Sequence, residues 1–133
     1  MLPQISSVKP KVFVIDDSAT VRRFFERIGI SVDVDLVTFE SAAASEEHLA
    51  SGAPGLMFLD IIMPDKDGLT FLQELRKDAK YRDTPVVMIS SKDYAQDRMT
   101  AKELGVVEFL PKPITTQTIE NLIRQYAGPP SDE

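Results

Sequence analysis

Three acidic residues are the part of this sequence whose types and spacing could do chemistry. Asp16 and Asp17 directly follow the segment 11–15, and Asp60 directly follows the segment 55–59. If the two segments are neighbouring parallel strands, the three carboxylates meet at one edge of a sheet. Like charges held that close raise one another's pKa values unless a cation neutralises them. The sequence therefore predicts a site for a hard divalent metal at this edge.

Five short apolar runs alternate with five helix-prone segments, and these elements must position the acids. We expect strands over 11–15, 33–39, 56–59, 86–89 and 106–110. We expect helices from Ser18 to a stop at Gly29, over 40–51, after Gly68, over 94–104 and over 115–126. Such alternation is typical of an α/β fold, a doubly wound parallel sheet with right-handed crossovers and helices on both faces.

Two further polar residues come at the ends of later strands. Ser90 closes the fourth run and Lys112 follows the fifth. Ligands of open α/β sheets bind outside the carboxyl ends of the strands, so the acids, the hydroxyl and the ammonium converge there. Mg²⁺, or Mn²⁺ in its place, takes carboxylates and a backbone carbonyl, for which Ile62 is well placed. A carboxylate such as that of Asp60 can attack phosphorus, while donors bind the phosphoryl oxygens. Together, these side chains are suited to binding a divalent metal and a phosphoryl group.

Length and composition limit the classes of function that this protein can have. The chain has 133 residues, 43% of them hydrophobic, which suits one soluble domain. A net charge of −6 gives no electrostatic reason to bind nucleic acid or an anionic membrane. No apolar run approaches the roughly 20 residues needed to cross a bilayer. The absence of cysteine excludes disulfides and thiolate metal sites, and it fits a reducing cytoplasm, where we expect the protein.

The motifs, taken in order, resemble those of one family. They are Asp16-Asp17-Ser18, Leu59-Asp60-Ile61-Ile62-Met63-Pro64 with Gly68 beyond it, Ser90-Ser91, and Lys112-Pro113. From about Lys11 to Tyr126 the chain resembles the receiver domain of two-component response regulators, the chemotaxis regulators among them. The resemblance implies a flavodoxin-like (βα)5 sheet with strand order 2-1-3-4-5. The receiver domain would span 11–127, between an N-terminal extension 1–10 and a tail or linker start 128–133.

The resemblance also assigns roles to the residues of the site. Asp60 would accept a phosphoryl group from a sensor histidine kinase or a phosphotransfer protein. Asp17 and Asp60 would ligate Mg²⁺ directly, with Asp16 acting through a bound water, and Ser90 and Lys112 would bind phosphoryl oxygens. The domain would be a signalling module rather than an enzyme, although an attached output domain could be one. Self-dephosphorylation would be slow at most.

A conformational switch is implied as well. Phosphorylation would draw the Ser90 hydroxyl inward, and Phe109 would turn into the space it leaves. Phe109 stands where relatives commonly have Tyr, so the switch would rest on packing alone. The face of helix four, strand five and helix five would then control a downstream effector, a fused output domain or a phosphorylation-dependent homodimer. As in relatives, the Lys112–Pro113 bond is expected to be cis.

Three other functions are compatible with parts of the pattern. An aspartate-nucleophile phosphatase has a similar sheet but separates its two aspartates by one residue, whereas Asp16 and Asp17 are adjacent. A flavin-binding protein of the same strand order needs a phosphate-cradling loop after the first strand, where these two acids would repel phosphate. A degenerate receiver would bind partners without phosphorylation, but no essential residue is missing.

Overall fold

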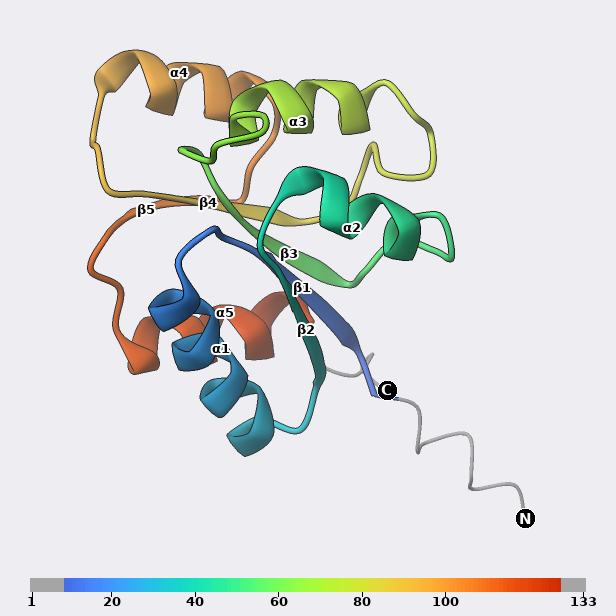
Figure 1. Ribbon diagram of the computed structural model, residues 1–133, viewed down its shortest axis with the longest axis vertical. Helices are drawn as coiled ribbons and strands as arrows, with labels where there is room; N and C mark the ends of the chain where they lie inside the picture. Colours follow the sequence, from blue (N-terminus) through green and yellow to red (C-terminus); the bar gives the residue numbers. More distant parts are fainter. Residues whose placement is uncertain (1–8, 128–133) are drawn as a thin grey trace.

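Strands and helices alternate strictly along the part of the chain that the computed structural model describes, residues 9–127 (Figure 1). The strands are β1 (Lys11–Ile15), β2 (Asp35–Phe39), β3 (Leu56–Asp60), β4 (Val86–Ser90) and β5 (Glu108–Pro111). The helices are α1 (Ala19–Ser31), α2 (Ala42–Leu49), α3 (Gly68–Arg76), α4 (Ala95–Glu103) and α5 (Thr116–Tyr126). Most of the predicted extension 1–10 and all of the tail 128–133 lie outside the described residues.

The strands form one parallel sheet in the order β2-β1-β3-β4-β5, as predicted. Ile15 pairs with Leu59, and Ser90 pairs with Pro111. This register brings the carboxyl ends of β1, β3, β4 and β5 to the same edge of the sheet. The residues that follow those four strands therefore become neighbours.

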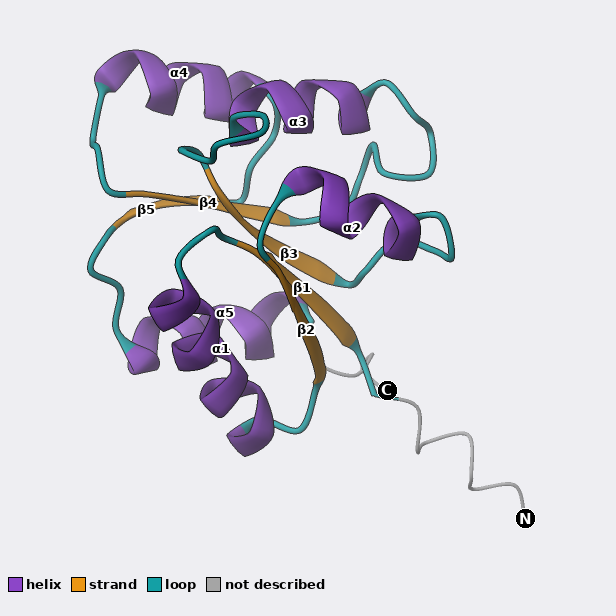
Figure 2. Cartoon of the chain, viewed as in Figure 1, coloured by secondary structure: helices purple, strands orange, loops and turns teal. Residues whose placement is uncertain are grey.

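Two apolar cores lie on the two faces of the sheet. α1 and α5 cover one face, and α2, α3 and α4 cover the other (Figure 2). The central strands β3 and β4 are buried along their whole lengths. A strand enclosed on both sides has to be apolar throughout, which explains why these runs do not alternate with polar residues. The arrangement confirms the predicted doubly wound α/β class. Within residues 9–127, no helix has the length and apolar character needed to traverse a bilayer.

Some predicted boundaries are wrong, and each has a local cause. α1 continues past Gly29 to Ser31, because Gly29 faces the sheet rather than ending the helix. A Cβ at Gly29 would lie 2.7 Å from the Leu36 Cβ, so only glycine allows this approach. β2 begins at Asp35 instead of residue 33, because Asp33 has a φ of 57° and cannot continue a strand.

Candidate functional site

Three carboxylates gather at the carboxyl edge of the sheet. Asp16, Asp17 and Asp60 each offer an oxygen within 4.8 Å of the others. The side chains of Asp16 and Asp60 are 0% and 2% exposed, whereas Asp17 is exposed. The strand register brings these predicted residues together, with two acids inside the protein and the third at its surface.

The turn after β1 fixes the first two acids. The Asp16 amide donates to the Phe39 carbonyl at 3.0 Å, which ties the turn to β2. The Asp16 Oδ1 accepts the Ser18 amide at 2.9 Å, and the Ser18 hydroxyl caps α1. Arg22, on the first turns of α1, donates to the Asp16 carbonyl at 2.8 Å. The turn is therefore held by backbone, side-chain and charge-assisted bonds.

The loop after Asp60 folds back onto the strand end. The Gly68 amide donates to the Ile61 carbonyl at 2.7 Å. A Cβ at Gly68 would lie 2.2 Å from the Asp60 carbonyl oxygen, a clash with rigid backbone. The first residue of α3 therefore has to be glycine for the loop to close against the acid.

Lys112 supplies the positive charge within the site. Its Nζ lies 2.9 Å from the Asp16 Oδ2 and 3.5 Å from the Asp60 Oδ1. Its backbone amide donates to the Ser90 carbonyl at 2.8 Å, which ties the loop after β5 to the end of β4. The Lys112–Pro113 peptide bond is cis, as predicted.

The close approach of the carboxylates, together with their burial, shifts the pKa values of the residues in the site. Burial, followed by the charge of Asp16, raises the pKa of Asp60 to about 7, against a smaller lowering by Lys112. Burial lowers the pKa of Lys112, but its contacts with Asp16 and the charge of Asp60 outweigh burial and raise it overall. One ammonium therefore only partly compensates the acids.

The donor set fits a hard divalent cation. Within the described residues, the buried Asp16 Oδ2 and Asp60 Oδ1 accept no hydrogen bond of good geometry, although Lys112 faces both. Buried carboxylate oxygens without a donor are costly, and a cation would satisfy them. These three carboxylates are ligands of the kind that Mg²⁺ prefers. The predicted Ile62 carbonyl belongs to the same loop, where the Ile62 side chain is 47% exposed.

Ser90 and Phe109 occupy the predicted switch positions in the sheet. The Ser90 side chain is fully buried, and its hydroxyl accepts the Lys92 amide at 3.1 Å. Phe109 is half-buried on β5 beside Met88 of β4. The guanidinium carbon of Arg98 lies 4.7 Å from the centroid of the Phe109 ring. A cation–π contact therefore adds to the packing that holds Phe109 in this position.

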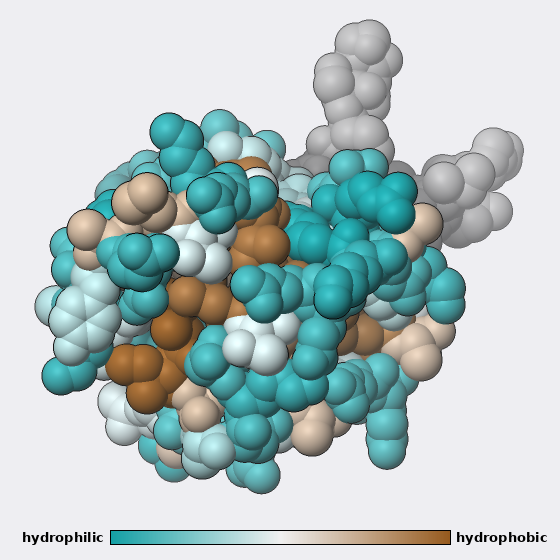
Figure 3. Space-filling view, turned by 90° about the horizontal axis from the view of Figure 1, so that it is seen from above, coloured by the Kyte–Doolittle hydropathy of each residue, from teal (hydrophilic) through white to brown (hydrophobic). Residues whose placement is uncertain are grey.

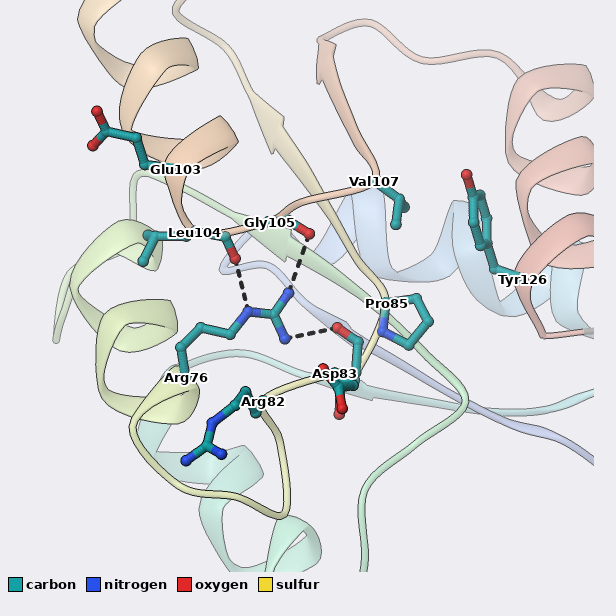
Figure 4. A pocket seen from close by; sticks show the side chains of 10 residues that line it. Arg76, Arg82, Asp83, Pro85, Glu103, Leu104, Gly105, Val107 and Tyr126 are labelled. Carbon is teal, nitrogen blue, oxygen red and sulfur yellow. Dashed lines mark hydrogen bonds between the residues drawn. The ribbon is translucent and has the colours of Figure 1, made fainter.

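Two of the surface hollows bear on the site, one because it is remote and the other because it adjoins Lys112. The larger, of about 490 Å³, lies at the amino ends of β4 and β5, on the opposite edge of the sheet (Figure 4). There Arg76 donates to the carbonyls of Leu104 and Gly105 after α4 and to those of Tyr81 and Thr84 after α3, so it braces two loops. The second hollow, of about 410 Å³, is mainly apolar and borders Lys112, between α1 and the loop before α5.

Comparison of the sequence with known protein families shows the family of this chain. The family described as "Response regulator receiver domain" matches residues 12–124. The chain belongs to this family. The receiver domain resemblance read from the motifs is thereby confirmed, and receiver domains are in general signalling domains rather than catalytic ones.

Two curated relatives place the receiver domain in different settings. This chain is 37% identical over 119 residues to the "Probable transcriptional regulator ycf27" of Porphyridium aerugineum. The aligned region covers 87% of this chain but only 47% of that relative. The chain is 32% identical over 116 residues to "Protein PilG" of Pseudomonas aeruginosa, covering 87% of this chain and 86% of the relative. The receiver domain thus spans about half of one relative and most of the other.

Solved structures share the fold of this receiver domain. The chemotaxis protein CheY4 of Vibrio cholerae superposes with a TM-score of 0.82 at 19% identity, covering 90% of this chain and 99% of that one. The phosphorylated cyanobacterial phytochrome response regulator RcpA superposes with a TM-score of 0.81 at 21% identity, covering 90% of this chain and 94% of that one. The fold is CheY-like and flavodoxin-like.

Proposed function

We propose that this receiver domain accepts a phosphoryl group on Asp60 in a reaction that depends on Mg²⁺. One observation carries the proposal. The buried Asp60 carboxylate lies beside two further carboxylates and has the Lys112 ammonium 3.5 Å from its Oδ1. An acid for attack, a donor for a phosphoryl oxygen and ligands for a cation thus lie in one cluster.

The residues divide the chemistry of transfer among them. An Asp60 oxygen forms a bond to phosphorus as the N–P bond of a phosphohistidine donor breaks, and the imidazole nitrogen keeps the electron pair and takes up a proton. Lys112 and the Ser90 hydroxyl stabilise the charge that spreads over the phosphoryl oxygens. The acceptor must be ionised to attack, which the Lys112 ammonium favours.

Asp17, Asp60 and the Ile62 carbonyl would hold Mg²⁺, with Asp16 acting through water. The metal, or Mn²⁺ in its place, supplies positive charge that the single Lys112 lacks. The buried Asp16 Oδ2 and Asp60 Oδ1 share the single Lys112 ammonium and accept no hydrogen bond of good geometry within the described residues, which supports a cation here.

The donor in this proposal is a sensor histidine kinase or a phosphotransfer protein. The apolar hollow between Phe24 and Ile114 lies beside Lys112, where such a donor would approach Asp60. The output would be the face of α4, β5 and α5, acting in the cytoplasm on an effector protein, a fused output domain or a second copy. The domain itself would cover 11–127, and the share of the transcriptional regulator relative that it spans is consistent with a fused domain.

Labelling with acetyl phosphate tests the proposal. The unsubstituted protein, incubated with acetyl phosphate and Mg²⁺, should gain the mass of one phosphate, and Asp60→Asn should gain none. Asp65→Asn is the matched control, because this exposed acid lies in the same loop as Ile62 but outside the cluster, where it accepts the Ala43 amide at 3.2 Å. Labelling should be lost in EDTA. Equal labelling of Asp60→Asn would refute the assignment, and turnover of an aryl phosphate would indicate the phosphatase alternative.

A further inference from the structure

The ring of Phe109 is covered by a charged residue of α4 rather than by solvent alone. Phe109 packs on one side against the apolar core beneath α3 and α4. On its other side lies the Arg98 guanidinium, whose central carbon is 4.7 Å from the ring centroid. Figure 3 views the molecule from the side of these two helices, and this face is largely hydrophilic, with hydrophobic surface showing between polar side chains.

Arg98 is in turn held by the loop that precedes its own helix. Its Nη2 donates to the Asp93 Oδ2 at 3.1 Å, and its Nε donates to the Asp93 Oδ1. This pairing lowers the pKa of Asp93 and raises that of Arg98. Both side chains are about half exposed, 44% for Arg98 and 49% for Asp93. An exposed pair of this kind adds little to stability, so it can form and break without unfolding the domain.

The same loop begins at the predicted phosphate-binding hydroxyl. Ser90 accepts the Lys92 amide, and Asp93 is the next residue. A continuous series of contacts therefore runs from Ser90 through Lys92 and Asp93 to Arg98 and the Phe109 ring. If Ser90 turns its hydroxyl to a phosphoryl oxygen, the Lys92 contact is lost and the loop that carries Asp93 is freed.

We propose that Arg98 is a latch that holds Phe109 in its half-buried position, and that it opens when Ser90 turns to the phosphoryl group on Asp60. This inference rests on the proposed phosphorylation of Asp60. The latch takes the place of the hydroxyl contact that a phenylalanine cannot make. On opening, the ring turns inward and the Arg98 guanidinium becomes free on α4. Phosphorylation would thereby change both the shape and the charge of the output face.

A single fluorescent reporter can follow the ring. The chain has no tryptophan, so Phe109→Trp introduces one whose acrylamide quenching measures its exposure. Adding Arg98→Met to this reporter should lower quenching before phosphorylation, because without Arg98 the inward position of the ring is populated in part even before Ser90 turns. Asp93→Asn should act in the same direction but less strongly. Arg124→Met should leave quenching unchanged, since it removes an exposed arginine of another helix, α5, whose Nη2 lies 3.9 Å from the Glu120 Oε1.

The direction of the change decides between the latch and a passive cover. If Arg98 only covers the ring, removing Arg98 leaves the ring in place and exposes it further. Unchanged or increased quenching would therefore overturn the latch. With Arg98 present, quenching should fall after acetyl phosphate treatment, with the added phosphate verified by intact mass. Labelled protein with unchanged quenching would overturn the latch while the proposed function stood. Absence of any label in the unsubstituted protein would overturn both.

A second measurement avoids the tryptophan substitution. In the protein with native Phe109, Arg98→Met should be labelled by acetyl phosphate about two- to fivefold faster, the change expected when one exposed cation–π contact no longer opposes the active conformation. Arg124→Met should be labelled at the unsubstituted rate. An equal rate for Arg98→Met would count against the latch.

Discussion

At the residue scale, the proposed chemistry of Asp60 and its surroundings favour opposite protonation states. The acceptor must be ionised, yet burial and the neighbouring charge of Asp16 raise its pKa to about 7. The cost of that ionisation is present in the folded protein and absent from the unfolded chain, where the carboxyl has its ordinary pKa of 3.8. Without a divalent cation the site is therefore a source of instability near neutral pH.

This conflict predicts a pH-dependent gain in stability on removing the acid. Because the folded state holds the Asp60 proton more tightly, stability falls as pH rises from about 4 and the penalty is complete above about 7. In EDTA, Asp60→Asn should be more stable than the unsubstituted protein by about 2–4 kcal/mol at pH 8, with a smaller difference at pH 5. Urea unfolding at the two pH values measures the difference.

Asp65→Asn is the control for this comparison, because it removes an exposed acid that is not one of the three clustered carboxylates. Mg²⁺ should stabilise the unsubstituted protein more than Asp60→Asn, since binding to the folded state shifts unfolding. A gain for Asp60→Asn that is independent of pH would contradict the electrostatic explanation.

Gly68 gives a steric prediction at the same scale. Gly68→Ala would bring a Cβ to 2.2 Å from the Asp60 carbonyl oxygen, so the loop after Asp60 must shift. We expect a loss of about 1–3 kcal/mol in stability together with slower labelling by acetyl phosphate. The matched control is Gly55→Ala, because a Cβ there meets only the Lys11 carbonyl oxygen at 3.5 Å, an ordinary contact. Equal effects of the two substitutions, by urea unfolding, would refute this explanation.

At the element scale, loops on both edges of the sheet are braced by arginines. At the amino edge, Arg76 of α3 donates to the carbonyls of Tyr81 and Thr84, each at 2.8 Å, as well as to those of the loop after α4. At the carboxyl edge, Arg22 of α1 holds the turn that bears the acids. The strands set where each loop starts, and these side chains set where it goes.

The Arg76 brace should be important for stability. Arg76→Met leaves several carbonyls without their donor, and we expect it to lower the free energy of unfolding by about 2–4 kcal/mol. Arg82→Met is the control, because Arg82 lines the same hollow but donates no hydrogen bond within residues 9–127. Denaturant midpoints compare the two. A loss for Arg82→Met as large as that for Arg76→Met would argue against the brace.

The sequence predicts the elements of this molecule better than the contacts between them. Apolar runs that stop at Asp16 and Asp60 identify strands and the edge where they end, so the class of fold and the cluster follow from local pattern. The pairing of Arg98 with Phe109 could not be predicted, because it depends on how α4 lies over β5. The role of Gly29 was missed for the same reason, since its neighbour Leu36 belongs to another element.

At the scale of the whole molecule, the two central strands β3 and β4 are enclosed on every side. β3 and β4 have a strand on either side and a layer of helices on either face. Their amides should therefore exchange with deuterium only through global unfolding, the slowest exchange in the protein. The prediction is that phosphorylation alters exchange in the loop 91–94 and in α4 but does not speed the exchange of the β3 and β4 amides, as mass spectrometry of peptic fragments can measure. Faster exchange in β4 would contradict it. If the prediction holds, the sheet is a rigid frame. The signal then passes around the sheet, through loops and side chains, and the sheet does not bend.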